Sequence, residues 1–281
     1  CGSLAYDTVM VYPGRFRDHI LPDQIHLLNV SFMVPTLRRY FGGCAGNIAY
    51  NLRLLETPGH AMGAVGHDFG PYRQWMIDNS MSLAHVHEIE GEYTAQAYIT
   101  TDLDANQLTA FHPGAMNHSW RLEVPADGSI SIGVLAPAGR DGMIAHARQF
   151  AAAGIPFVFD PGQAMTLFNG DELVSFVKQA AWVTVNDYEA QLLQERTGLA
   201  NADIAARVKA YIVTQGVQGS VIHAGGRRIE IPAVRVGEVV DPTGCGDAYR
   251  AGLLYGLARH LDWETTGRVA SLMGAIKIAV V

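Results

Sequence analysis

The residues from Asp241 to Ala248, which read DPTGCGDA, place two carboxylates and two glycines ahead of a predicted helix. After Ala248 the apolar residues recur at helical spacing, so the glycines are expected at a helix N-terminus. Unpaired N–H groups and the helix dipole favour an anion there, and glycine lets it approach closely. A single Gly-Asp in this position is usually only a helix cap. Two carboxylates around a glycine turn suit phosphoryl transfer, in which amides neutralise the moving group and a carboxylate takes the proton of the attacking hydroxyl.

Two common phosphate-binding motifs are excluded by inspection. A P-loop needs a Gly-Lys-Ser/Thr sequence, but none of the three lysines follows a glycine. A dinucleotide-binding fingerprint needs a third glycine where Tyr249 stands. The glycine turn therefore belongs to another class of phosphate site.

The composition is that of a well-packed globular protein. The 281 residues are 49% hydrophobic and 17% charged, with a formal net charge of −7, which argues against disorder and against nucleic-acid binding. The three cysteines show no pairing pattern, so a cytoplasmic location is expected, with Cys245 as a small space-filling residue. No apolar run approaches the roughly 18 residues of a membrane span. We expect one domain over residues 1–281.

The order of predicted elements indicates a doubly wound, mostly parallel sheet flanked by helices. Short β-rich runs alternate with helical stretches. Strands are predicted at 130–135, 156–160, 182–186 and 211–214, and helices at 142–153, 171–180, 187–196, from Asp247 and from about Asp262.

Two segments interrupt this alternation. Residues 13–41 show no clear helix, and residues 90–113 contain alternating apolar runs that suit an antiparallel hairpin. Together they predict a small β lid over a site on the main sheet. An edge extension or a homodimer contact is the alternative, and both roles can coexist.

Motifs along nearly the whole chain resemble those of the ribokinase-like (PfkB) family of sugar and nucleoside kinases. The octapeptide resembles the family's second signature, and residues 42–47 (GGCAGN), before a helix at 48–55, resemble its first. Residues 2–7 resemble the first strand with its substrate-binding aspartate, 186–189 resemble the Asn-x-x-Glu motif, and 214–219 resemble the Thr-x-Gly-x-x-Gly segment near the nucleotide.

The resemblance implies a role for the acceptor site. Asp247 would be the base, and the anion hole would be formed by the amides of Gly244, Cys245 and Gly246. Asp7 and Asn47 would hold vicinal hydroxyls, since a carboxylate and an amide together suit a diol. Gly42 and Gly43 would allow a hinge or the close approach of a sugar.

The same resemblance implies ATP as donor and Mg²⁺ as metal. Asn186 and Glu189 would arrange Mg²⁺ waters against phosphate, with a helix cap and a solvated acid as the alternative. Thr214, Gly216 and Gly219 would line the nucleotide pocket. Asp241 would order the anion-hole loop and could belong to a K⁺ site.

Arg250 and the histidines are further candidates for a chemical role. Arg250 lies one turn into the helix after Asp247, and an exposed arginine is expected there. The eleven histidines show no metal-ligand spacing, so no zinc site is expected.

The substrate is expected to be a nucleoside. The GGCAGN form of the first signature, with the lid residues 100–107 and 111–116, looks most like nucleoside-kinase members, adenosine kinase foremost. Phe111 and Met116, with Tyr12 or Phe16, could sandwich a purine, although such residues are more often core. The predicted reaction is transfer of the γ-phosphate to the 5′-hydroxyl of a purine nucleoside. A ribose or fructose-type sugar kinase is the alternative, and a silent ligand sensor is disfavoured because Asp247 and its glycines are intact.

Overall fold

A six-stranded sheet forms the centre of the computed structural model, which describes residues 1–20, 29–237 and 239–280. Its strand order is β12-β11-β10-β9-β8-β7, and neighbours from β7 to β10 are parallel, whereas β11 and β12 add antiparallel hairpins. The strands are β7 (Gly133–Leu135), β8 (Phe157–Phe159), β9 (Trp182–Asn186), β10 (Ala210–Thr214), β11 (Ser220–Ala224) and β12 (Arg227–Ile231). This is the doubly wound, mostly parallel arrangement that the sequence predicts.

The first residues of the chain join this sheet to a smaller one. Ser3 donates its N–H to the carbonyl of Pro137 after β7, and Gly2 donates to Met62 of β3 (His60–Val65). Strand β3 pairs in parallel with β4 (Ser82–Glu88). The N-terminal segment therefore lies between the two sheets before it continues as β1.

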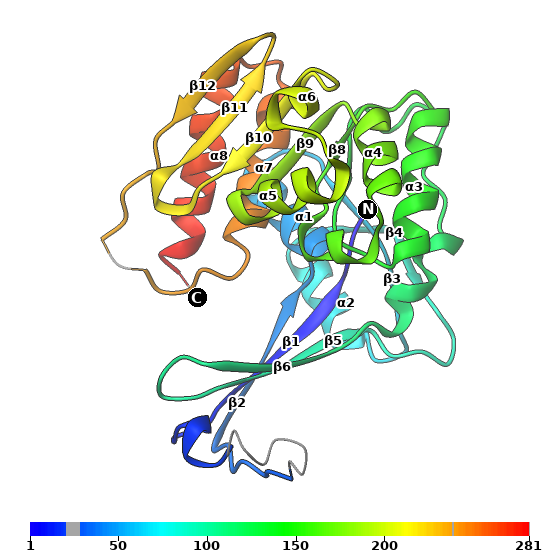
Figure 1. Ribbon diagram of the computed structural model, residues 1–281. Helices are drawn as coiled ribbons and strands as arrows, with labels where there is room; N and C mark the ends of the chain where they lie inside the picture. Colours follow the sequence, from blue (N-terminus) through cyan, green and yellow to red (C-terminus); the bar gives the residue numbers. More distant parts are fainter. Residues whose placement is uncertain (21–28, 238, 281) are drawn as a thin grey trace.

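Helices cover both faces of the six-stranded sheet, as Figure 1 shows. Alternation along β8 explains this, because Phe157 and Phe159 pack into one core cluster and Val158 into another. The first cluster includes side chains of α3 (Arg140–Ala152), α4 (Gly170–Gln179), α5 (Asp187–Thr197) and α6 (Asn201–Ala205). The second includes α1 (Cys44–Leu54), α7 (Cys245–Ala258) and α8 (Trp263–Ile278).

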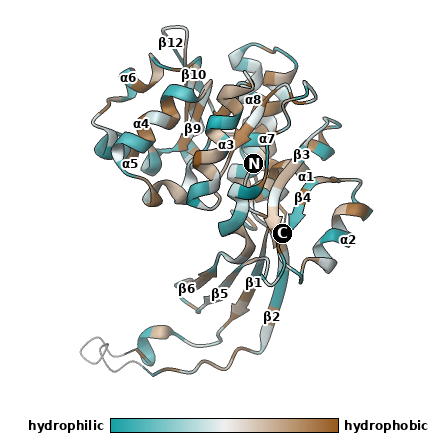
Figure 2. Cartoon of the chain, turned by 90° about the vertical axis from the view of Figure 1, so that its right-hand side faces the viewer, coloured by the Kyte–Doolittle hydropathy of each residue, from teal (hydrophilic) through white to brown (hydrophobic). Residues whose placement is uncertain are grey.

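A separate four-stranded sheet projects from the body, as Figures 1 and 2 show. Its order is β2-β1-β5-β6, made of β2 (Thr36–Gly42), β1 (Ala5–Val11), β5 (Ala95–Thr101) and β6 (Gln107–His112). Residues from both interrupting segments thus lie in one sheet, with β1 between them. Residues 21–28 of the first segment lie outside the described residues.

Local signals explain where several helices begin and end. Asn169 and Glu172 form a reciprocal capping box at the start of α4, and Asp262 caps α8 through the N–H of Thr265. Gly198 ends α5 in the left-handed conformation, with φ of 68°. The predicted helices and strands lie within a few residues of the observed ones, whereas the sequence analysis does not predict α2 (Gly70–Asp78), α6, β3, β4, β11 and β12.

No helix in the described part of the chain is long and apolar enough to cross a membrane.

Candidate active site

The largest group of predicted site residues lines one pocket at the edge of the six-stranded sheet. Parallel strands β8, β9 and β10 end at this edge, so Asp160, Asn186 and Thr214 lie there together. The pocket has a volume of about 840 Å³. Predicted residues that line it are Asn186, Glu189, Thr214, Gly216, Gly219, Gly244, Cys245, Gly246 and Asp247.

Asp247 lies in the first turn of α7 but does not cap it. The N-cap is Gly244, whose φ of 75° and ψ of 2° are left-handed values that favour glycine, and α7 has no side-chain cap. The Asp247 carboxylate instead accepts a hydrogen bond of 2.8 Å from Asn47 Nδ2 of α1. The simple capping interpretation of Asp247 is therefore wrong.

The turn before Asp247 offers amide donors to the pocket. Cys245 N–H donates to the Pro242 carbonyl at 3.2 Å, but the amides of Gly244 and Gly246 have no acceptor among the described residues. With the positive end of the α7 dipole, these amides can neutralise an anion. Burial raises the pKa of the Cys245 thiol, which disfavours the thiolate that a nucleophile would need.

Burial also changes the chemistry of Asp247 itself. It raises the carboxyl pKa to about 6, a shift that the Asn47 hydrogen bond and the Arg250 charge reduce and that the Asp160 charge increases. A pKa near 6 leaves the group ionised at neutral pH yet more basic than an exposed carboxylate. This is suited to a general base.

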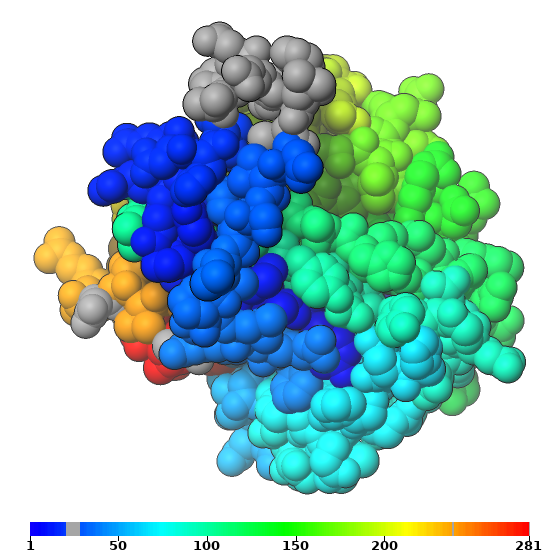
Figure 3. All heavy atoms as spheres, turned by 90° about the horizontal axis from the view of Figure 1, so that it is seen from below, coloured from blue at the N-terminus to red at the C-terminus, as the bar shows by residue number. Residues whose placement is uncertain are grey.

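The two glycines adjoin Asp7 and the helix that carries Asn47. Gly43, with φ of 87°, is the N-cap of α1, which places Asn47 in the first turn. A Cβ at Gly42 would collide with the Asp7 carboxylate, so a larger residue there would displace that side chain. Burial raises the pKa of Asp7 to about 6. Figure 3 views the molecule from below relative to Figure 1. It shows the N-terminal residues (blue) on this face, with C-terminal residues (orange and red) at their edge.

Strand register places Phe111 on the same face as Asp7. Asp7 lies opposite Tyr40 of β2 and Ala97 of β5, and Ala97 lies opposite Phe111 of β6. Partners in a register share a face of the sheet, so these residues form one row, which we call the Asp7 row. Tyr40 and Phe111 are 36% and 48% exposed. Tyr40 was not predicted, because its place opposite Asp7 depends on the pairing of β1 with β2.

The other candidates for binding the base lie outside the Asp7 row. Met116 is half-buried and packs against the main core, so it is not in the Asp7 row. Tyr12 and Phe16 stack on each other, with ring centroids 6.0 Å apart, and both contact Phe32 beyond the end of β1. Of the four residues that the sequence suggested for a purine sandwich, only Phe111 lies in the Asp7 row, and the packing of Met116, Tyr12 and Phe16 gives that arrangement no support.

Asn186 and Glu189 form the capping box of α5 and also line the pocket. Asn186 Oδ1 accepts from the Glu189 N–H at 2.7 Å, and Glu189 Oε2 accepts from the Asn186 N–H at 2.9 Å. Burial raises the pKa of Glu189, against the opposing effect of the capping hydrogen bond. One Glu189 oxygen stays available for a metal-bound water. In the described parts of the chain no group of three ligating side chains could hold a metal ion.

Thr214, Gly216 and Gly219 lie where β10 ends. The Thr214 hydroxyl donates to the Val185 carbonyl at 3.4 Å, and Gly219 has a φ of 95° that a side chain would not tolerate against Ile231. Their neighbour Val217 is 92% exposed at the pocket rim. This part of the pocket combines backbone groups with an apolar side chain.

Asp241 orders the turn that leads to α7. Its Oδ1 accepts from the Thr243 N–H at 2.9 Å, and its Oδ2 lies 3.5 Å from Lys277 Nζ of α8. Partial burial opposes its ionisation, but these contacts outweigh it and lower the pKa of Asp241. A cation of the chain itself therefore lies beside this carboxylate.

Arg250 corrects the expectation of an exposed side chain. It is 6% exposed and forms a two-pronged ion pair with Asp160, with both N–O distances 2.9 Å. The signal was available, because the surrounding α7 sequence is apolar on nearly every side and a buried arginine needs a partner. Asp160 likewise follows the apolar strand β8.

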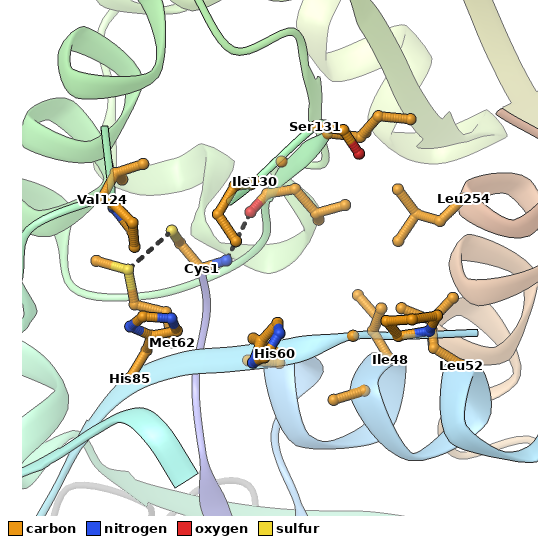
Figure 4. A pocket seen from close by; sticks show the side chains of 18 of the residues that line it. Cys1, Ile48, Leu52, His60, Met62, His85, Val124, Ile130, Ser131 and Leu254 are labelled. Carbon is orange, nitrogen blue, oxygen red and sulfur yellow. Dashed lines mark hydrogen bonds between the residues drawn. The ribbon is translucent and has the colours of Figure 1, made fainter. Parts of the chain in front are cut away.

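A second cavity, of about 230 Å³, lies behind α1 and away from Asp247. Figure 4 shows its apolar lining, with Ile48, Leu52 and Leu254 on one side and His60 and His85 on the other. It contains none of the predicted site residues. The pocket beside α7 is therefore the candidate active site.

Comparison with known proteins agrees with this geometry. Residues 4–281 match the model of the pfkB family carbohydrate kinases. The chain belongs to this family. As a PfkB-family kinase it is a phosphotransferase that acts on an alcohol group, and the family implies ATP and a divalent metal.

Similar proteins include several nucleoside kinases. A curated nucleoside kinase of Methanocaldococcus jannaschii is 32% identical over 246 residues, which cover 86% of this chain and 80% of the relative. The structure of Burkholderia thailandensis nucleoside kinase in complex with inosine is 49% identical, with a TM-score of 0.90, and the match covers 100% of this chain and 90% of that one. The M. jannaschii structure also has a TM-score of 0.90, at 28% identity and with coverage of 99% and 90%. These matches confirm the ribokinase-like fold.

Proposed function

We propose that this PfkB-family member transfers the γ-phosphate of ATP to the 5′-hydroxyl of a nucleoside, with a purine nucleoside such as adenosine or inosine as substrate. The observation that carries the proposal is the Asn47–Asp247 hydrogen bond at the mouth of the α7 anion site. It joins the amide that we propose for diol binding to the carboxylate of raised pKa that we propose as the base. The 49% identity to a nucleoside kinase solved with inosine supports the nucleoside class.

In this proposal the described residues have separate roles in the reaction. Asp7 and Asn47 bind the ribose hydroxyls and orient the sugar, so that its 5′-hydroxyl faces Asp247. Asp247 accepts the hydroxyl proton as the oxygen bonds to the γ-phosphorus, and the bond from that phosphorus to the β–γ bridging oxygen breaks, so that ADP leaves. The amides of Gly244 and Gly246 stabilise the charge on the transferring phosphoryl group, and Cys245 contributes its amide once the turn opens.

The donor occupies the rest of the pocket in this proposal. Thr214, Gly216 and Gly219 line its nucleotide portion, and Val217 offers apolar contact to the base. Mg²⁺ is the metal that we propose, and it would neutralise phosphate charge. Glu189 would hold it through water, with Asn186 keeping Glu189 in place.

A K⁺ ion at Asp241 is the less favoured arrangement, because Lys277 already lies beside this carboxylate. The lysine and the ion would compete for the same negative charge. The two arrangements predict different responses to K⁺, which are given in the Discussion.

The Asp7 row supports a nucleoside over a free sugar. Tyr40 and Phe111 are aromatic and partly exposed, and between them lie only Asp7 and the small Ala97. An aromatic side chain beside the ribose site can stack on a base, and a free sugar offers no such surface. A ribose or fructose-type sugar kinase remains the alternative that the assay below tests.

A thermal-shift panel followed by turnover assays tests the proposal. Adenosine, inosine and guanosine should raise the melting temperature, with and without MgATP, because a ligand that binds only the native state stabilises it. The nucleosides that bind should then give 5′-monophosphates. If ribose or fructose-type sugars bind and turn over while the nucleosides do neither, the nucleoside assignment is wrong.

We also propose that the projecting four-stranded sheet forms a homodimer contact, in addition to its predicted role as a lid. Leu37, Tyr98 and Leu108 are 60%, 40% and 45% exposed on it, and sedimentation of the wild-type chain would measure the state directly. The three cysteines are free, in keeping with the cytoplasmic location that we propose.

A further inference from the structure

The buried pair of Arg250 and Asp160 contributes to the lining of the candidate active site. Arg250 Nε and Nη2 donate to the two oxygens of Asp160, and their side chains are only 8% and 4% exposed. Burial opposes the charge of Arg250, but Asp160 outweighs this effect and raises the guanidinium pKa. A buried ion pair often adds nothing to stability beyond what apolar residues would give. Stability alone therefore does not explain its presence at this place.

The geometry ties the pair to the start of α7. Arg250 Nη1 donates to the Gly246 carbonyl at 3.3 Å, one turn earlier in the helix. The two-pronged contact with Asp160, which follows β8, fixes the plane and direction of the guanidinium. Arg250 thus connects the sheet edge with the turn that holds the anion-site amides and Asp247.

The charges around Asp247 come from every element packed against it. Asp160 opposes its ionised form and Arg250 favours it, so the two charges act on Asp247 in opposite directions. The other titratable groups near it are Cys44 of α1, Cys245 of α7, Tyr72 of α2, and Glu189 of α5 beyond Arg250.

We propose that Arg250, held by Asp160, is a positioning residue that fixes the first turn of α7 and places a permanent positive charge beneath Asp247. The inference rests on the proposed role of Asp247 as base. It does not depend on which alcohol is phosphorylated, so it is tested with whichever acceptor the wild-type enzyme turns over. Wild-type turnover tests the proposed function, and the variants test this inference.

The kcat/KM of the enzyme should fall at low pH, and we call this falling part of its pH profile the acidic limb. Two single variants should move the acidic limb in opposite directions. Arg250→Met leaves Asp160 unopposed, so the limb should move to higher pH by about half a unit or more. Asp160→Asn leaves Arg250 unopposed, so the limb should move to lower pH. In Arg250→Met, kcat should fall about tenfold or more, with KM for the acceptor within about threefold of wild type, since the loss affects the transition state.

Two further variants separate charge from geometry. Arg250→Lys keeps the charge but loses the two-pronged contact, so its limb should stay near that of wild type while kcat recovers only in part. The double variant Asp160→Asn/Arg250→Met removes both buried charges and so leaves neither unpaired, which favours folding. Its limb should return near that of wild type with kcat still reduced. If Arg250→Met does not fold, Asp160→Asn and the double variant carry the test.

Arg259→Met is the matched control, because Arg259 lies at the other end of α7, exposed over the ring of Tyr255. It should change neither kcat nor the limb. The inference is overturned if both single variants move the limb in the same direction or leave it in place. It is also overturned if Arg250→Met keeps kcat within about twofold of wild type, or if the control reproduces the effect.

Discussion

Replacing the base by its neutral isostere should stabilise the protein while it abolishes turnover. In Asp247→Asn the side-chain oxygen can still accept the hydrogen bond from Asn47, so the packing of α1 against α7 is kept. The change removes only the buried charge. Activity should fall by about three orders of magnitude or more, because no other group is placed to accept the proton.

The expected gain in stability follows from the raised pKa. The Asp247 carboxyl titrates at about 6 in the folded protein against an ordinary value of 3.8. Above pH 6 the folded protein holds a charge that the unfolded chain carries more easily, and the difference is about 3 kcal/mol. For a chain of this length that corresponds to about 5 °C in melting temperature.

The pH dependence of this gain distinguishes it from a packing effect. As pH falls through 6, the folded wild-type protein takes up the proton and the destabilisation is relieved; it is about half as large at pH 5 and disappears below about pH 4. Differential scanning calorimetry at pH 8, 6 and 5 measures the difference between variant and wild type. Asp78→Asn, at the exposed end of α2, is the control and should show no such trend. A variant less stable than wild type by the same amount at every pH would refute the reasoning.

Three further outcomes are expected. The kcat/KM of the wild-type enzyme should fall below about pH 6, as Asp247 takes up a proton, and a profile flat to pH 4.5 would contradict the role of base. In steady-state assays, Phe111→Ala should raise the KM for a nucleoside by about 5- to 100-fold and keep kcat within about threefold of wild type. The control Leu103→Ala, in the neighbouring exposed turn, should not raise this KM. Equal effects of the two variants would show that Phe111 does not bind the base. Replacing KCl by choline chloride should leave wild-type turnover unchanged and slow Lys277→Met, since the lysine charge beside Asp241 is then missing; a wild-type enzyme that needs K⁺ would favour the ion over the lysine.

The sequence predicted the elements whose pattern is local. Strand β9 was assigned residue for residue, and α5 differs at its end by one residue, because alternation and helical spacing are visible without tertiary contacts. Strand β7 proved shorter than predicted, since Ile130 and Ile132 are apolar but lie outside the sheet. Strands β11 and β12 were not assigned, although two glycines form the turn between them.

In the candidate site, too, residues in local motifs could be predicted, whereas residues placed by tertiary contacts could not be fully predicted. Asp247, Asn47 and Asp7 lie in motifs, and the structure places Asp247 and Asn47 in contact. The apolar residues around Arg250 in α7 indicate that it is buried, but its helix does not identify the partner Asp160, which lies 90 residues away. Tyr40 shares a face with Asp7 only through the pairing of β1 with β2, which single-strand patterns do not reveal.

The contact between Asn47 and Asp247 joins residues 200 positions apart, one on the first helix and one on the seventh. No fragment made early in synthesis can hold this contact. The enzyme therefore cannot begin to work until α7 has been made and has docked beside α1. Phosphoryl transfer by a refolding sample would consequently report the completion of folding, and would lag behind the secondary structure that forms within shorter stretches of the chain.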